Sequence, residues 1–101
     1  PWIGIYGGDI TSDIAEEYDL SRDYGVYVAE VIENSPAAEE GLKRGDIIVE
    51  IGDQNISTMD ELKKKLKKYQ VGEEIKILFY RNQKSITRNL KLEERPMEGK
   101  D

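Results

Sequence analysis

The sequence predicts an α+β fold: a small, partly open β-barrel or sandwich of about five or six short strands, two helices and a short helical turn. Three observations predict it. Short runs rich in Val and Ile recur between glycine-containing turns. Residues 34–46 form a compact segment with the signals of one helical turn. A capped amphipathic helix begins after Thr58. The chain has 101 residues, which fits one domain.

Local patterns set the individual elements. Residues 11–18 are predicted to be helical, because a Ser/Thr start leads into acidic first turns. Gly7-Gly8 is expected to end the first strand. Gly52-Asp53 is expected to form a type II′ hairpin turn, which places glycine first. The predicted strands are 2–6, 26–32, 47–51, 54–56, 75–80 and 85–92.

The segment 34–46 is the most informative part of the chain. Ser35 can cap a helix, and Pro36 suits its first position, where no N–H is needed. Gly41 suits the exit, where a left-handed residue is favoured. A helix this short is not stable alone, because nucleation is unfavourable. We therefore expect it to dock against the sheet, and Gly45-Asp46 to lead into the next strand.

The second helix has the clearest start. Thr58 and Glu61 have the spacing of a capping box, in which Glu61 reaches back to the backbone of the cap. One apolar stripe follows at helical spacing, and it predicts core packing for Leu62 and Tyr69. The stripe consists of Met59, Leu62, Leu66 and Tyr69. The lysines between residues 63 and 68 are interpreted as the solvated side of this helix rather than as a nucleic-acid patch.

Composition excludes several kinds of site. The chain has no His and no Cys, which excludes a Ser-His-Asp triad, a Cys nucleophile with a His base, and a His/Cys zinc site. Asp9, Thr11 and Asp13 have the first spacings of a calcium loop, but Leu20 stands where its closing Glu is required. We expect no catalytic residue, metal or cofactor. The net charge of −6 disfavours nucleic acid or an anionic membrane as partner.

One stretch has a possible binding role. In Trp2-Ile3-Gly4-Ile5, apolar side chains flank a glycine, so Ile3 and Ile5 are predicted to point the same way. The glycine allows the backbone to turn and present consecutive N–H groups. Such clusters of N–H groups can bind a terminal carboxylate.

Together these pieces resemble a PDZ domain, specifically that of HtrA-type (DegP-like) serine proteases. Trp2-Ile3-Gly4-Ile5 resembles the carboxylate-binding loop of that family, and the helix at 11–18 resembles its insertion. Ser35-Pro36-Ala37-Ala38, Gly45-Asp46-Ile47-Ile48 and Asp60-Glu61-Leu62 resemble its other motifs. The match spans residues 1–93, and 94–101 is expected to be a flexible polar tail.

The resemblance implies a PDZ-like fold and binding by β-augmentation, in which a peptide C-terminus adds as a strand beside Ile5-Tyr6-Gly7. It implies carboxylate binding by the N–H groups of Ile3, Gly4 and Ile5, and an apolar pocket for the last ligand residue. Met59 and Lys63 are expected at upstream ligand positions. The candidate site residues are Trp2, Ile3, Gly4, Ile5, Tyr6, Gly7, Met59, Lys63 and Leu66.

The resemblance also implies a setting. The domain would bind unfolded or mislocalised polypeptides with an apolar last residue, and regulate or feed an adjoining protease domain outside the cytoplasm, in the periplasm or cell envelope. It would have no activity of its own. Three alternatives remain open: a PDZ module of a tail-specific or site-2-type membrane protease, a structural module whose groove is filled by its own chain or a neighbouring subunit, and a small enzyme using carboxylates alone.

Overall fold

The computed structural model describes residues 1–17 and 24–96. The predicted end of the first helix at Tyr18 and the tail residues 97–101 lie outside this part of the chain. The helices are α1 (Ser12–Glu17), α2 (Pro36–Glu39) and α3 (Met59–Leu66). The strands are β1 (Ile5–Asp9), β2 (Val26–Val31), β3 (Ile47–Ile51), β4 (Gln54–Asn55), β5 (Glu74–Arg81) and β6 (Lys84–Lys91). The predicted α+β architecture is confirmed.

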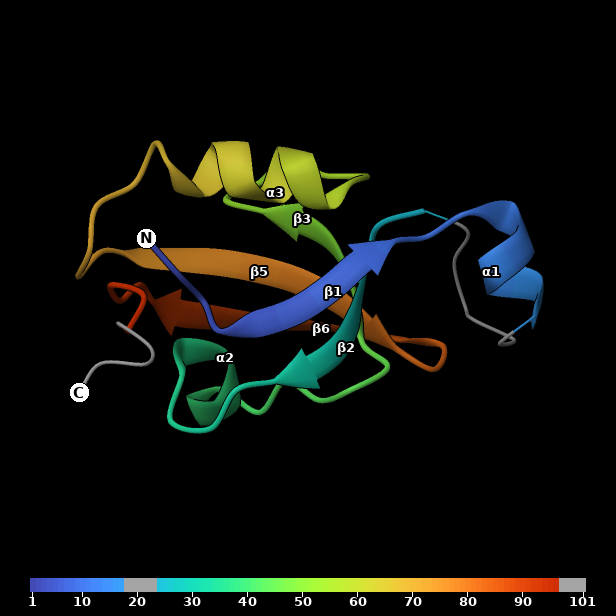
Figure 1. Ribbon diagram of the computed structural model, residues 1–101, viewed down its shortest axis with the longest axis horizontal. Helices are drawn as coiled ribbons and strands as arrows, with labels where there is room; N and C mark the ends of the chain where they lie inside the picture. The colour runs from blue at the N-terminus through green and yellow to red at the C-terminus, as the bar shows by residue number, and fades with distance from the viewer. Residues whose placement is uncertain (18–23, 97–101) are drawn as a thin grey trace.

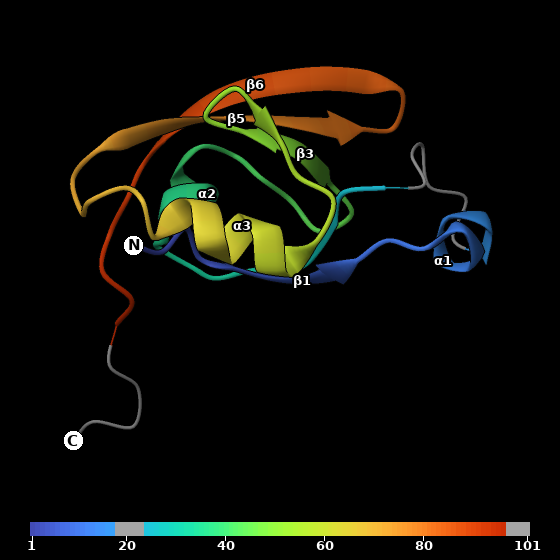
Figure 2. The same ribbon diagram turned by 90° about the horizontal axis from the view of Figure 1, so that it is seen from above.

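The strands form one antiparallel sheet that does not close into a full barrel. Its order is β1-β2-β3-β5-β6, and β4 pairs with β3. β1 is thus an edge strand of the sheet. Figure 1 shows the sheet curving between α3 on one side and α2 on the other, while α1 projects away from the body. Seen from above, α3 runs along β1 (Figure 2). The free edge of β1 therefore faces a helix.

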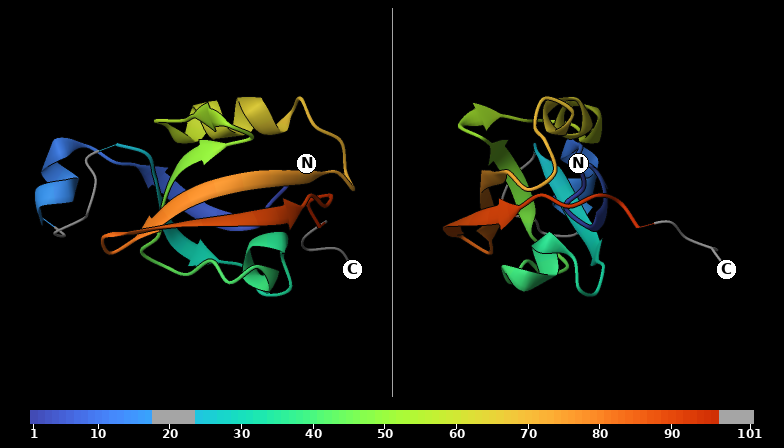
Figure 3. Two further views of the ribbon diagram at one scale, coloured as in Figure 1. Left: turned by 180° about the vertical axis from the view of Figure 1, so that it is seen from behind. Right: turned by 90° about the vertical axis from the view of Figure 1, so that its left-hand side faces the viewer.

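Figure 3 shows the curved sheet from behind and from one side. Its strands form the main hydrophobic core together with residues of α2 and α3. This core contains Val26, Val28, Ile77 and Phe79 from the strands, each at most 1% exposed, and Leu62 from α3. A second, smaller cluster combines residues of β3 with Ile10 and with Ala15, the only α1 residue in it. Its buried members are Ile10, Ala15, Ile47 and Val49.

The first strand differs from its prediction. Gly7-Gly8 was expected to end it, but both glycines lie inside β1, and Trp2 forms only an isolated bridge with Glu93. The pairing of β1 with β2 shifts register between Tyr6 and Gly7. A Cβ at Gly7 would lie 2.3 Å from the carbonyl oxygen of Tyr27, so glycine permits this close approach rather than stopping the strand.

The prediction for the turn between β3 and β4 was wrong in type. A type II′ turn has positive φ only at its first central residue. Here Gly52 has φ 59° and Asp53 has φ 68°, as in a type I′ turn. Aspartate visits the left-handed region more often than most residues because its short polar side chain can hydrogen-bond to the local backbone. The hairpin therefore forms at the predicted position with a different backbone.

The helical turn α2 is capped as the sequence predicts. The hydroxyl of Ser35 accepts a hydrogen bond from the Ala38 N–H at 3.2 Å, and Pro36 occupies the first turn. The helix ends before Gly41, which has φ 85°. Two contacts dock this helical turn: the Ala37 N–H donates to the carbonyl of Ile3 at 2.9 Å, and the Leu42 side chain is 4% exposed within the core.

An ion pair between the buried Asp46 and the partly exposed Arg81 fixes the segment after α2, and the sequence patterns did not predict it. Asp46 is 1% exposed and accepts two hydrogen bonds from Arg81, at 2.9 and 2.8 Å. It also accepts from the Lys43 N–H at 2.8 Å, while Arg81 donates to the Gly41 carbonyl. The hydrogen bond with Asp46 raises the pKa of Arg81. Asp46 is therefore a structural anchor rather than only the start of a strand.

Candidate functional site

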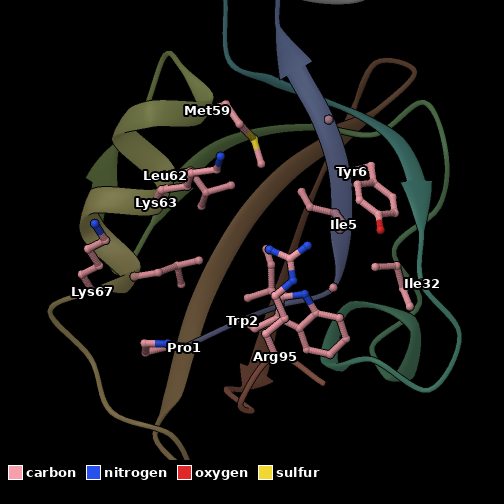
Figure 4. A pocket seen from close by; sticks show the side chains of 14 residues that line it. Pro1, Trp2, Ile5, Tyr6, Ile32, Met59, Leu62, Lys63, Lys67 and Arg95 are labelled. Carbon is pink, nitrogen blue, oxygen red and sulfur yellow. The ribbon is translucent and has the colours of Figure 1, made fainter. Parts of the chain in front are cut away.

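A groove of about 530 Å³ lies between β1 and α3. Figure 4 shows β1 along one wall and α3 along the other. All the candidate site residues from the sequence line it: Trp2, Ile3, Gly4, Ile5, Tyr6, Gly7, Met59, Lys63 and Leu66. The groove also has lining residues that the sequence analysis did not select: Pro1, Ile32, Leu62, Lys67 and Arg95.

The backbone before β1 has its carbonyls turned into the protein. The carbonyl of Trp2 accepts from the Glu93 N–H at 3.3 Å, that of Ile3 from Ala37 at 2.9 Å, and that of Gly4 from Ile32 at 2.9 Å. In a trans peptide the N–H of the next residue points opposite to the carbonyl. The N–H groups of Ile3, Gly4 and Ile5 therefore point away from these internal partners.

Gly4 is required at the centre of this loop. Its φ is +91°, a conformation that side chains rarely adopt. A Cβ at this position would lie 2.0 Å from the Cβ of Ser35, the residue that caps α2. The Ser35 hydroxyl also donates to the Gly4 carbonyl at 3.4 Å. The most recognisable motif of the sequence is thus packed directly against the loop of the site.

The floor of the groove is apolar. Ile3, Ile5 and Leu66 are each less than 9% exposed, and Leu62 is 1% exposed. The core position predicted for Leu62 is confirmed, but its side chain also lines the groove. Tyr69 lies beyond the groove and packs, half-buried, against the core. An apolar side chain entering the groove would therefore be removed from water.

Adjacent residues of β1 face opposite sides. Figure 4 shows Ile5 directed toward the α3 side and Tyr6 directed toward Ile32. Tyr6 is 46% exposed. This alternation is normal for a strand. Of these two neighbours, Ile5 is the one whose side chain contributes to the apolar floor.

The start of α3 is held by both its own cap and β1. The Thr58 hydroxyl accepts from the Glu61 N–H at 3.1 Å, which confirms the cap. The Glu61 carboxylate accepts from the Ser57 N–H at 2.7 Å, one residue earlier than a capping box predicts. Asp9, at the end of β1, accepts from the Met59 N–H at 2.7 Å. This last bond joins the two walls of the groove at one end, and no local pattern predicted it.

The charged side chains that line the groove are all basic. Its lining residues include Lys63, Lys67 and Arg95 and no Asp or Glu, although the chain as a whole has a net charge of −6. Figure 4 shows Lys63 near Met59, at the opposite end of the groove from Trp2 and Arg95. The groove thus combines an apolar floor with a positive surround, which suits a ligand carrying negative charge.

Across residues 1–17 and 24–96, no three potential metal ligands of the His, Cys, Asp or Glu type lie together. None of the described helices has the length and hydropathy of a membrane span.

Comparison with known proteins decides the family. The sequence profile described as the PDZ domain matches residues 3–92. The chain belongs to the PDZ domain family. Domains of this family are binding modules and not catalytic ones, and the related serine proteases carry their catalysis in a separate protease domain.

Relatives of this PDZ domain are HtrA-type proteases. A probable periplasmic serine protease do/HhoA-like from Haemophilus influenzae is 36% identical over 91 residues, which cover 90% of this chain and 20% of that protein. The periplasmic serine endoprotease DegP of Salmonella typhimurium is 33% identical, over 91% of this chain and 19% of its own length. The PDZ domain therefore spans about 20% of the length of such relatives.

Solved structures agree with the fold. The HtrA-type protease AlgW with decapeptide has a TM-score of 0.86 and 29% identity, covering 95% of this chain and 30% of its own. The HtrA3 PDZ domain bound to a phage-derived ligand (FGRWV) has a TM-score of 0.80 and 26% identity, covering 89% and 83%. Both neighbours are peptide complexes of HtrA-type proteins.

Proposed function

We propose that this PDZ domain captures the C-terminus of a polypeptide whose last residue is apolar. The observation that carries the proposal is the outward orientation of the Ile3, Gly4 and Ile5 N–H groups at the end of an apolar groove. These groups would bind the terminal carboxylate, since consecutive backbone N–H groups form anion sites. Trp2 packs next to Gly4 and shapes this end of the groove.

The ligand would bind as an added strand. β1 pairs with β2 on one side, and its other edge faces the groove. A peptide beside Ile5-Tyr6-Gly7 would hydrogen-bond to the backbone of that edge, which is the β-augmentation mode of recognition. Since the inward-facing Gly4 carbonyl directs the Ile5 N–H outward, the ladder would begin at the carboxylate loop.

The last ligand residue would insert between Ile3, Ile5 and Leu66. Fully burying a Val or Leu side chain stabilises a complex by roughly 1.5–3 kcal/mol, enough to select apolar over polar residues at this position. The ligand of the HtrA3 PDZ domain, FGRWV, ends in valine, which supports this expectation. Met59 and Lys63 would contact residues further upstream, and Lys63 would favour an acidic side chain there.

The relatives support a proposal about the protein that contains this domain and about its location. We propose that it recognises substrate or regulatory polypeptides, including unfolded or mislocalised chains, for an HtrA-type serine protease that contains it. The relatives are named periplasmic, which supports a location outside the cytoplasm. These HtrA-type names favour such a parent over a tail-specific or site-2-type protease. Residues 1–93 would form the binding module and 94–101 the tail.

An NMR titration tests the binding site. The 101-residue chain is titrated with FGRWV, the ligand of the HtrA3 neighbour. We expect the largest amide shifts at residues 3–7 and along α3. Shifts confined to another face would contradict the proposal. Absence of shifts together with oligomers in sedimentation would instead favour the rival in which the chain or a neighbouring subunit fills the groove.

A further inference from the structure

We propose that Arg95 supplies the positive charge that holds the ligand carboxylate, reaching the groove from the segment after β6. This inference rests on the proposed function, since it concerns the same end of the same groove. It adds a binding residue outside the loop and helix that the sequence analysis selected, and it extends the binding module beyond residue 93.

The chain after β6 returns to the carboxylate loop. The Glu93 N–H donates to the Trp2 carbonyl at 3.3 Å, and Trp2 and Glu93 form an antiparallel bridge. This pairing places the next residues beside the loop, and Arg95 lines the groove. Figure 4 shows its side chain passing the Trp2 indole, with the guanidinium lying between that ring and Ile5 in this view.

Arg95 is the cation best placed for this role. Lys63 lies beside Met59, at the other end of the groove, and Lys67 points outward from α3 (Figure 4). Within residues 1–17 and 24–96, Arg95 has no carboxylate within ion-pair distance, whereas Arg81 is fully engaged by Asp46. Its guanidinium is therefore available to a ligand.

The chemistry of the site favours a guanidinium here. Three N–H groups provide partial positive charge but no full countercharge for a carboxylate. Arginine binds carboxylates through two parallel N–H donors and stays charged throughout the pH range in which proteins are normally studied. Among the described residues, no Asp or Glu lines the groove itself, and the nearest acidic lining residues of Arg95's other neighbouring pocket are Glu30 and Glu33, on the far side of β1. Binding would also restrict residues 93–96, because the ligand would join them to the loop.

The test compares two forms of one peptide. FGRWV is prepared as the free acid and as the C-terminal amide, and both are titrated into the 101-residue chain by calorimetry. Arg95→Gln removes the charge while keeping most of the side-chain length. Arg88→Gln is the matched control, because Arg88 is an exposed arginine on β6 that does not line the groove.

We expect Arg95→Gln to weaken binding of the free acid about three- to tenfold and to leave binding of the amide unchanged. The two Kd values would therefore lie closer together than in the unmodified chain. Arg95→Lys should restore part of the difference, and Arg88→Gln should change neither affinity. Equal weakening of both peptides would assign Arg95 a packing role only and overturn the inference. The inference would also be overturned if Arg95→Gln changed neither affinity. If the unmodified domain binds acid and amide equally, the proposed function itself fails.

Discussion

The amide of Ala37 donates a hydrogen bond to the carbonyl of Ile3 across 2.9 Å. Ala37 lies in the first turn of α2, where backbone N–H groups lack partners within the helix. The bond satisfies one of them and at the same time turns the Ile3 carbonyl inward. The N–H of Gly4 therefore points outward. A segment that the sequence marks as scaffold thus sets the geometry of the proposed carboxylate site.

Replacing Gly4 should be strongly destabilising. In Gly4→Ala the new Cβ would lie 2.0 Å from Ser35 Cβ, on a backbone with φ +91°. Left-handed strain and overpacking together should lower the free energy of unfolding by about 2–4 kcal/mol, measured by urea denaturation. The control is Gly8→Ala, because nothing lies within 4 Å of a Cβ there. It should change stability by less than about 0.5 kcal/mol. Equal effects of the two substitutions would refute this account of Gly4.

The bond between Asp9 and the Met59 N–H should matter for binding as well as stability. Asp9→Ala and Thr58→Ala each remove an acceptor at the start of α3, and each should reduce the free energy of unfolding by about 1 kcal/mol. Asp9 alone joins α3 to β1. Both substitutions should loosen the start of α3 and so weaken peptide binding slightly. We expect Asp9→Ala to weaken it further, because it also removes the link between the two walls of the groove. The comparison needs urea denaturation and peptide titration of both variants, and indistinguishable peptide affinities would show that this bond does not set the groove.

The Asp46–Arg81 pair should be a major contribution to stability. Arg81→Met leaves the carboxylate of Asp46 almost fully buried without its charged partner. We expect a loss of about 2–4 kcal/mol in unfolding free energy, somewhat less than the roughly 3–5 kcal/mol for a fully buried pair, because Arg81 is partly exposed. Lys76→Met removes the exposed pair with Asp53 and serves as the control. It should cause no clear change.

The Asp46–Arg81 pair also predicts how the stability of the domain depends on pH. Asp46 raises the pKa of Arg81, so the contribution of the guanidinium is complete below its unfolded pKa and is lost only as pH rises through the higher folded value. That window lies above the range in which proteins are normally studied. The difference in unfolding free energy between the unmodified chain and Arg81→Met should therefore persist from pH 7 to pH 10. A difference that vanished by pH 10 would be inconsistent with this pairing.

Lys63 should influence which upstream residues are accepted. Lys63→Glu should weaken peptides with an acidic upstream residue and favour those with a lysine there, each by less than about fivefold, because exposed charge pairs contribute little. The control is Lys68→Glu, which makes the same charge change just after the C-terminal end of α3. Lys68 is exposed and does not line the groove. A competition assay with the two peptides measures the preference. If both variants shift it equally, the effect is one of net charge and not of position.

The sequence predicted those parts of the fold that depend on neighbouring residues. Ser35, Pro36 and Gly41 place α2, and Thr58 places the start of α3, because caps and turns are local chemistry. The candidate site residues, which the resemblance to a PDZ domain supplied, line one groove in the structure. Helical spacing adds only that Met59, Lys63 and Leu66 share one ridge of α3.

What the sequence missed depends on contacts between distant residues. Asp46 and Arg81 are 35 residues apart, and Asp9 and Met59 are 50 apart. Gly7-Gly8 continues β1 because β2 approaches closely, which no local rule reveals. Arg95 was assigned to a tail, and only the pairing of Glu93 with Trp2 brings it to the groove.

The most direct test of the proposed function is the affinity of the unmodified domain for one apolar-ended peptide, such as FGRWV, as free acid and as C-terminal amide. Amidation removes the charge that the Ile3, Gly4 and Ile5 N–H groups would bind, while the apolar side chain and the strand backbone remain. Since hydrogen bonds to a charged group contribute about 1.5–3 kcal/mol, the acid should bind at least about tenfold more tightly. Equal affinities would contradict carboxylate recognition by this loop.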